Sequence, residues 1–107
     1  MQYLVTGEYV ETGALLPPPQ MTQMIEQTII PSLEALAKLQ KDGKILAGGI
    51  VVGARAGVFV LEAASHDAVT RTLLALPFWG LLKWDVTPLE SFSHRASFER
   101  ELAGARK

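Results

Sequence analysis

The chain has 107 residues, of which 49% are hydrophobic, and a formal net charge of −1. Its lysine and arginine residues are scattered, which argues against a nucleic-acid partner, and the absence of cysteine excludes disulfides, thiolate metal ligands and cysteine nucleophiles. A mean hydropathy of +0.21 is apolar for so small a protein, so we expect residues 1–107 to form one domain that associates into a homodimer or higher homo-oligomer.

The first predicted element is a strand over residues 2–10, which are rich in aromatic and β-branched side chains and precede Thr12 and Gly13. Successive side chains of a strand point to opposite faces, so Glu8 lies on the same face as Leu4. A carboxylate on a largely apolar strand face is a candidate functional group.

A long helix is predicted to begin near Pro19 or Gln20, because proline suits the first turn of a helix. Its apolar residues recur at three- and four-residue spacing, as expected for a helix that packs on a sheet; they are Met21, Met24, Ile25, Ile29, Leu33, Leu36 and Leu39. Pro31 interrupts this stripe, so the helix should kink or restart near Ile30. Gly43 is predicted to end the helix in a left-handed cap.

Residues 44–52 and 57–63 read as two strands of a hairpin that turns over residues 53–56. Their apolar residues are consecutive rather than alternating, so both faces of this sheet should be covered. Helices cover one face, and in so short a chain another subunit must cover the other. Gly48 and Gly49 indicate a bulge or a close approach by another group.

The rest of the chain begins with a helix capped by Ser65 and ended by Pro77. A last strand follows over residues 81–86 and resumes past Pro88, and a short charged helix covers residues 97–105. The order strand, helix, strand, strand, helix, strand predicts an α+β, ferredoxin-like domain. We expect an antiparallel four-stranded sheet with both helices on one face, and a dimeric α/β barrel made by the sheets of two subunits.

Both tryptophans lie in the stretch from Leu76 to Val86, where a helix ends and a strand begins. Large aromatic rings at such a junction can line a cavity between helices and sheet that holds a small organic molecule. Trp79 and Trp84 are therefore predicted to bind substrate. The alternative is that both rings fill the core.

Several segments carry a resemblance to a known family; they are Leu39-Gln40-Lys41-Asp42-Gly43, Ser65 with Ala68, Leu76-Pro77-Phe78-Trp79, Trp84-Asp85-Val86 and His94. Over residues 36 to 95 the chain resembles the muconolactone isomerase-like group of dimeric α/β barrel proteins. The resemblance implies cofactor-free proton transfer within an unsaturated lactone, or elimination of chloride from a chlorinated one, in the catabolism of aromatic compounds. True isomerases carry Trp, His and Arg in the second strand, whereas residues 45–50 here contain none, which indicates a more apolar ligand.

Glu8 and Glu62 are predicted on the two central strands, as parallel neighbours. If both faced one apolar side, mutual repulsion would favour a carboxylate that accepts a proton near neutral pH, as a catalytic base does. The alternative is that each carboxylate faces solvent or pairs with a basic residue.

His94 and Arg95 follow the last predicted strand, where the histidine would relay a proton and the arginine would hold a carboxylate or enolate oxygen. A solvated loop is the alternative for both. The hydroxyls of Tyr3 and Tyr9 are candidate donors to an enolate oxygen, or else these rings pack in the sheet.

Several other features are not expected. His66, beside a helix cap, reads as a surface residue, and the two histidines lack the spacing of a metal site. No glycine-rich loop opens a helix, so neither a nucleotide nor any other cofactor is predicted. The N-terminus lacks a basic region and no segment approaches the ~20 apolar residues that span a bilayer, so we expect a cytoplasmic protein without a membrane partner.

Three hypotheses follow for the function. The first is a cofactor-free isomerase or lyase acting on a small unsaturated lactone or cyclic ketone, with Glu8 as base and His94 assisting. The second is a non-catalytic protein that binds a small apolar molecule or serves in assembly. The third is a cofactor-free monooxygenase acting on a phenol or quinone, which would consume oxygen.

Overall fold

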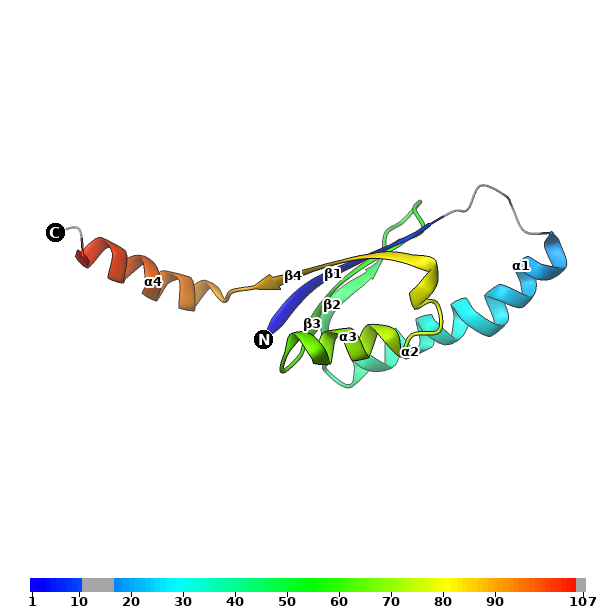
Figure 1. Cartoon of the computed structure of the whole chain (residues 1–107), viewed down its shortest axis with the longest axis horizontal. Helices are drawn as coiled ribbons and strands as arrows, with labels where there is room; N and C mark the ends of the chain where they lie inside the picture. Colours follow the sequence, from blue (N-terminus) through cyan, green and yellow to red (C-terminus); the bar gives the residue numbers. More distant parts are fainter. Residues whose placement is uncertain (11–16, 106–107) are drawn as a thin grey trace.

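The computed structural model describes residues 1–10 and 17–105, so the predicted strand end at Thr12 and Gly13 lies outside the described residues. Its elements follow the predicted order, and the last strand leads into a long terminal helix (Figure 1). They are β1 (Gln2–Tyr9), α1 (Pro18–Met24), the π-helical η1 (Ile25–Ile29), α2 (Ile30–Lys41), β2 (Ile45–Ile50), β3 (Ala56–Glu62), α3 (His66–Leu74), the 3-10 helix η2 (Trp79–Leu81), β4 (Leu82–Leu89) and α4 (Phe92–Ala105).

The four strands form one sheet in the order β2-β3-β1-β4, and all neighbouring strands are antiparallel. The segment from α1 to α2 and helix α3 lie on the same side of this sheet (Figure 1). The predicted α+β, ferredoxin-like fold is therefore confirmed. The expectation that the two central strands are parallel is wrong, because the hairpin returns β3 between β1 and β2 in the opposite direction.

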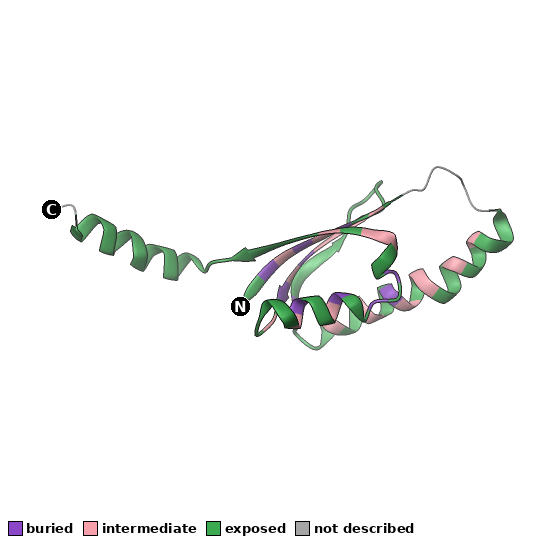
Figure 2. Ribbon diagram, viewed as in Figure 1, coloured by how far each residue is buried: buried purple, intermediate pink, exposed green. Residues whose placement is uncertain are grey.

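The core lies between the sheet and the helices, where alternate side chains of the strands point. Figure 2 shows the buried residues on the strands and on the helix surfaces that face them. The buried apolar residues are Tyr3, Val5, Ile45, Phe59, Leu61, Val69, Leu73, Leu76 and Phe78. On β1 these are odd-numbered positions, so its even-numbered side chains point to the other face of the sheet.

That other face of the sheet, here called the open face, has no helix of the described chain over it (Figure 1). Leu4, Val58 and Val60 share it by register and are half-buried. An apolar sheet face that its own chain leaves uncovered is the basis for expecting a second subunit there.

The irregularity predicted at Pro31 takes the form of a π-helical segment, η1, immediately before it. Proline has no backbone N–H, and its ring clashes with the preceding turn, so the usual i→i−4 bonding cannot continue through this point. Gly43 adopts φ +81° and ends α2 as predicted.

The predicted bulge in the second strand is also present, because the pairing of β2 with β3 shifts between Ile45 and Ala47. Gly48 then lies against β3 with φ +148°, and a Cβ atom there would lie 2.4 Å from the Cβ of Phe59 and 2.4 Å from the carbonyl oxygen of Val58. Glycine is required at this position because only a hydrogen atom fits.

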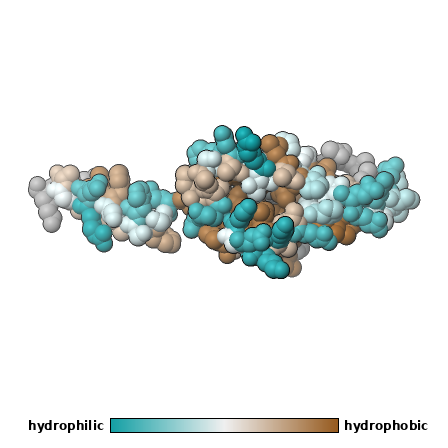
Figure 3. Space-filling model, turned by 90° about the horizontal axis from the view of Figure 1, so that it is seen from below, coloured by the Kyte–Doolittle hydropathy of each residue, from teal (hydrophilic) through white to brown (hydrophobic). Residues whose placement is uncertain are grey.

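The last helix begins five residues earlier than predicted. Helix α4 starts at Phe92 and has no buried residue. It projects from the end of β4 as a separate lobe in which hydrophilic and hydrophobic side chains are mixed (Figures 1 and 3). In the described part of the chain, no helix combines the length and the apolar character needed to cross a membrane.

Candidate functional site

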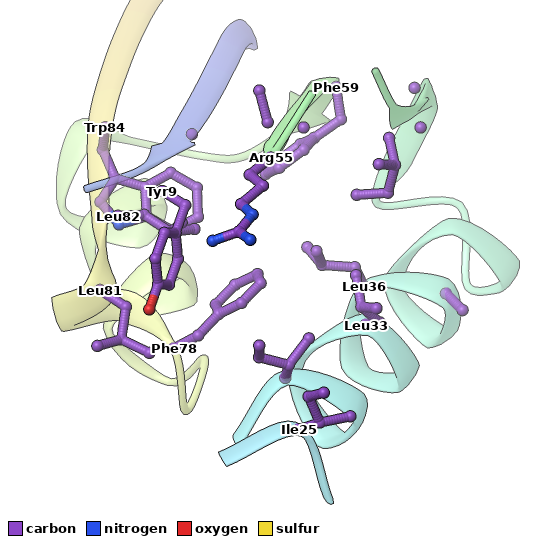
Figure 4. Close-up of a pocket in the computed structure, with 18 of the residues that line it drawn as sticks. Tyr9, Ile25, Leu33, Leu36, Arg55, Phe59, Phe78, Leu81, Leu82 and Trp84 are labelled. Atoms are coloured by element: carbon purple, nitrogen blue, oxygen red, sulfur yellow. The ribbon is translucent and has the colours of Figure 1, made fainter. Parts of the chain in front are cut away.

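A cavity of about 560 Å³ lies between the sheet and the helical segment α1–η1–α2. Its walls are mainly apolar and aromatic, and side chains from both layers point into it (Figure 4). They include Leu33, Leu36, Phe59, Phe78, Leu82 and Trp84. The volume lies in the range of natural small-molecule sites, so this cavity is the candidate functional site.

Trp84 forms one wall of the cavity, as predicted, and the sequence explains how its ring fits. Gly7 lies opposite Trp84 in the sheet, and a Cβ atom on Gly7 would lie 2.8 Å from the ring. The Trp84 indole nitrogen donates a hydrogen bond of 3.0 Å to the backbone oxygen of Trp79, and the ring of Phe78 meets the indole edge-on. Trp79 itself is 43% exposed and is not among the lining residues.

Arg55 supplies a charged group to this apolar site, which the sequence analysis did not anticipate. It lies in the hairpin before β3, and its carbonyl accepts a 2.8 Å hydrogen bond from the backbone N–H of Tyr9. Its guanidinium reaches into the cavity and lies 5.7 Å from the centre of the Tyr9 ring (Figure 4). Among the described lining residues, Arg55 is the one with a permanent charge. The signal in the sequence was a single cation in a turn between two apolar strands.

Ser32 fixes the position of Phe78 in the cavity wall. Its side chain is fully buried in α2. The hydroxyl donates a 2.7 Å hydrogen bond to the backbone oxygen of Thr28 and accepts a 3.0 Å bond from the backbone N–H of Phe78. One hydroxyl therefore joins the long helix to the loop that carries Phe78.

Glu8 lies on the open face of the sheet and is exposed, whereas the cavity lies on the opposite face. Glu62 is on the open face too, but the register places it opposite Gln2, six residues along β1 from Glu8, or about 20 Å. Its carboxylate lies 2.8 Å from the N-terminal amine of Met1. The two carboxylates are too far apart to act on each other, and neither reaches the cavity.

Tyr3 belongs to the core rather than to the cavity. Its ring is fully buried, and its hydroxyl lies 3.0 Å from Nδ1 of His66. His66 is exposed, as predicted, but it also packs edge-on against the Tyr3 ring beside a smaller hollow of about 270 Å³.

His94 and Arg95 lie on the exposed helix α4, not in a loop, and both are distant from the cavity (Figure 1). The hydrogen bond from Arg95 to Glu99, at 2.9 Å, together with the nearby charge of Glu99 and Glu90, raises the pKa of Arg95 above its usual value. Nδ1 of His94 lies 3.7 Å from a carboxylate oxygen of Glu90. Within one chain these residues make local pairs on α4 instead of joining Trp84.

Comparison with known proteins decides the family. The model of the muconolactone delta-isomerase family matches residues 1–95. The chain belongs to this family. The predicted resemblance is thus confirmed, and it extends through the first strand and helix. The sequence matches no curated protein.

Two solved structures share the fold of this family member. The crystal structure of a muconolactone isomerase is 22% identical, with a TM-score of 0.67 over 85% of this chain and 90% of that one. A 5-chloro-2-hydroxyhydroquinone dehydrochlorinase from Burkholderia phenoliruptrix, in complex with 2,5-dihydroxybenzoquinone, is also 22% identical, with a TM-score of 0.62 over 88% of this chain and 98% of that one. At this identity the likeness concerns the fold.

Two features of this family member stand out beside the match. Most of α4 lies beyond residue 95, where the family model ends. No three His, Asp or Glu side chains come together as possible metal ligands within residues 1–10 and 17–105. The polar groups that the cavity offers are therefore those of Arg55, Tyr9 and Gln40, in the part of the chain that is described.

Proposed function

We propose that this protein is a cofactor-free isomerase or lyase that moves a proton within a small unsaturated lactone or related cyclic ketone. The observation that carries the proposal is a cavity with apolar walls and a cation, Arg55, beside Tyr9, in a chain of the muconolactone delta-isomerase family. The names of the two similar structures, an isomerase and a dehydrochlorinase bound to a quinone, agree with this class of chemistry.

The cavity suits the intermediate of such a reaction. When a proton leaves the carbon beside a carbonyl, the electron pair moves onto the carbonyl oxygen and forms an enolate. The Arg55 guanidinium and the Tyr9 hydroxyl stabilise that negative oxygen, and apolar walls strengthen their effect because they exclude water. Return of the proton to another carbon completes the isomerisation, whereas loss of a neighbouring chloride completes an elimination.

The roles predicted for Glu8 and His94 are not part of this proposal. Glu8 faces away from the cavity, and His94 lies on α4 outside the body of the domain. The proposal gives the electrostatic role to Arg55 and Tyr9, and it keeps Trp84 as a wall of the substrate site.

Proton NMR in deuterated water tests the proposal, with muconolactone and a panel of unsaturated lactones and cyclic enones. We expect enzyme-dependent uptake of deuterium beside the carbonyl of at least one compound. Tyr9→Phe should slow this exchange about 10- to 100-fold, as loss of one donor to an enolate does. Exchange rates equal to those without protein across the panel would contradict the proposal, and oxygen consumption would favour the monooxygenase hypothesis instead.

A second candidate function is binding of an apolar molecule without turnover. It is favoured by the chemistry of the described lining residues, which include no carboxylate and no imidazole. Trp84 lies in the wall, so bound ligands should change its fluorescence. A change in fluorescence without deuterium exchange would support this function over catalysis.

We also propose that a second copy of the chain covers the open face and closes the predicted barrel. Val60→Lys places a charge among the half-buried side chains of that face and should convert the assembly into monomers in light scattering. Val52→Lys is the matched control, because Val52 is 98% exposed in the hairpin turn. If the Val60 variant keeps the mass of the wild type, the open face is not the interface.

A further inference from the structure

We infer that the cavity selects ring compounds larger than a simple lactone that carry one negative charge, and that Arg55 is the residue that determines this preference. The inference concerns the site of the proposed function and rests on it for the location of the ligand. It differs from the sequence-based expectation, which pointed to a wholly apolar ligand because the second strand has no cation.

The size of the cavity argues for a ligand larger than one small ring. A cavity of roughly 150 Å³ in an engineered protein core is large enough to bind benzene. The cavity here measures about 560 Å³. A single ring would leave much of the wall without contacts, whereas a fused or substituted ring system would fill more of the space.

The walls determine the chemistry of the larger part of the ligand. Side chains from both layers that face the centre are hydrocarbon or aromatic, among them Ile25, Leu33, Leu36, Phe59 and Phe78 (Figure 4). A polar group of the ligand placed against them would lose its hydrogen bonds to water without replacement. The part of the ligand between β3 and α2 should therefore be apolar.

Arg55 determines the chemistry of the other end. The backbone bond between Tyr9 and Arg55 ties the hairpin to the end of β1, so the guanidinium is held beside the Tyr9 ring at the cavity. A guanidinium has five N–H donors and can hold a carboxylate, phenolate or enolate oxygen in addition to other partners. Because Arg55 is the single permanent charge of the described lining, one anionic group is matched and a second would not be.

Binding of 2-naphthoate and of 2-naphthamide tests the inference, since the two ligands have nearly the same shape and differ in charge. We expect the wild type to bind naphthoate at least about 10-fold more tightly than naphthamide, as for hydrogen bonds to charged groups. Arg55→Gln should weaken naphthoate binding about 10-fold or more and leave naphthamide binding within about 2-fold. Benzoate, with one ring, should bind more weakly than naphthoate.

Two variants serve as controls. Arg71→Gln removes the same charge from the exposed surface of α3, away from the cavity, and should bind both ligands like the wild type. Arg55→Lys retains the charge and should recover part of the preference for naphthoate. Calorimetry measures all of these affinities, and the circular dichroism spectrum shows that each variant is folded.

The inference is overturned if naphthamide binds as tightly as naphthoate, if Arg55→Gln weakens both ligands equally, or if naphthoate does not bind at millimolar concentration. These outcomes are separate from failure of the proposed function. Charge-selective binding with no deuterium exchange in any lactone or enone would uphold the inference and reject the proposed catalysis. Exchange without charge-selective binding would do the reverse.

Discussion

Replacing Gly48 by alanine should destabilise the domain by about 2–5 kcal/mol, because the new methyl group combines a strained backbone with overpacking. The strain comes from φ +148°, and the overpacking comes from the Cβ of Phe59 and the backbone of Val58 at 2.4 Å. Backbone of the neighbouring strand cannot move aside as a flexible side chain can. The free energy of unfolding, from urea denaturation, measures the loss.

Gly49→Ala is the matched control for this prediction. The adjacent glycine has no atom within 4 Å of its would-be Cβ and no positive φ. Its replacement should leave the free energy of unfolding unchanged or raise it by a few tenths of a kcal/mol, because alanine has fewer unfolded conformations. Equal losses in the two variants would mean that the close approach of β2 to β3 at Gly48 is not what requires a glycine.

Replacing Ser32 by alanine should cost about 1–3 kcal/mol, because the buried N–H of Phe78 would lose its acceptor. A loss of 2 kcal/mol corresponds to a melting temperature about 8–16 °C lower for a domain of this size. The same variant should weaken ligand binding, since Phe78 is part of the cavity wall. Thermal unfolding followed by circular dichroism measures the first effect.

Ser97→Ala makes the same substitution at an exposed helical site. The Ser97 hydroxyl donates a 3.2 Å hydrogen bond to the backbone oxygen of Ser93, which lies one turn earlier in α4. Water can replace this bond, so the variant should unfold within about 0.5 kcal/mol of the wild type. A Ser32 variant as stable as this control would show that the link between α2 and Phe78 contributes nothing to stability.

The order and type of the elements were predictable because their signals are local. Periodicity, Ser65 as a cap, Pro31 as an interruption and Gly43 as a helix end each depend on neighbouring residues. The start of α4 was missed because residues 92–96 contain little apolar periodicity, and nothing in the described chain packs on that helix.

The site was less predictable because it depends on which face of the sheet the helices cover. The period of two shows that Glu8 shares a face with Leu4, but the same pattern does not tell which face is inside. The structure places the helices over the face of Gly7 and Tyr9, so the carboxylate falls on the other side. Arg55 shows the reverse case, since a turn residue reaches the cavity only through the pairing that brings its hairpin to β1.

The central claim is that the chemistry takes place in the cavity on the helix face, and filling that cavity tests it most directly. Ala37 lines the cavity from α2, so Ala37→Phe should abolish deuterium exchange, whereas Ala96→Phe on the exposed helix α4 should not. The measurement is the exchange rate by NMR in deuterated water, with Glu8→Gln assayed in parallel. Loss of exchange in Ala37→Phe alone is the result that the account predicts. Full exchange in Ala37→Phe together with its loss in Glu8→Gln would contradict it and move the reaction to the open face of the sheet.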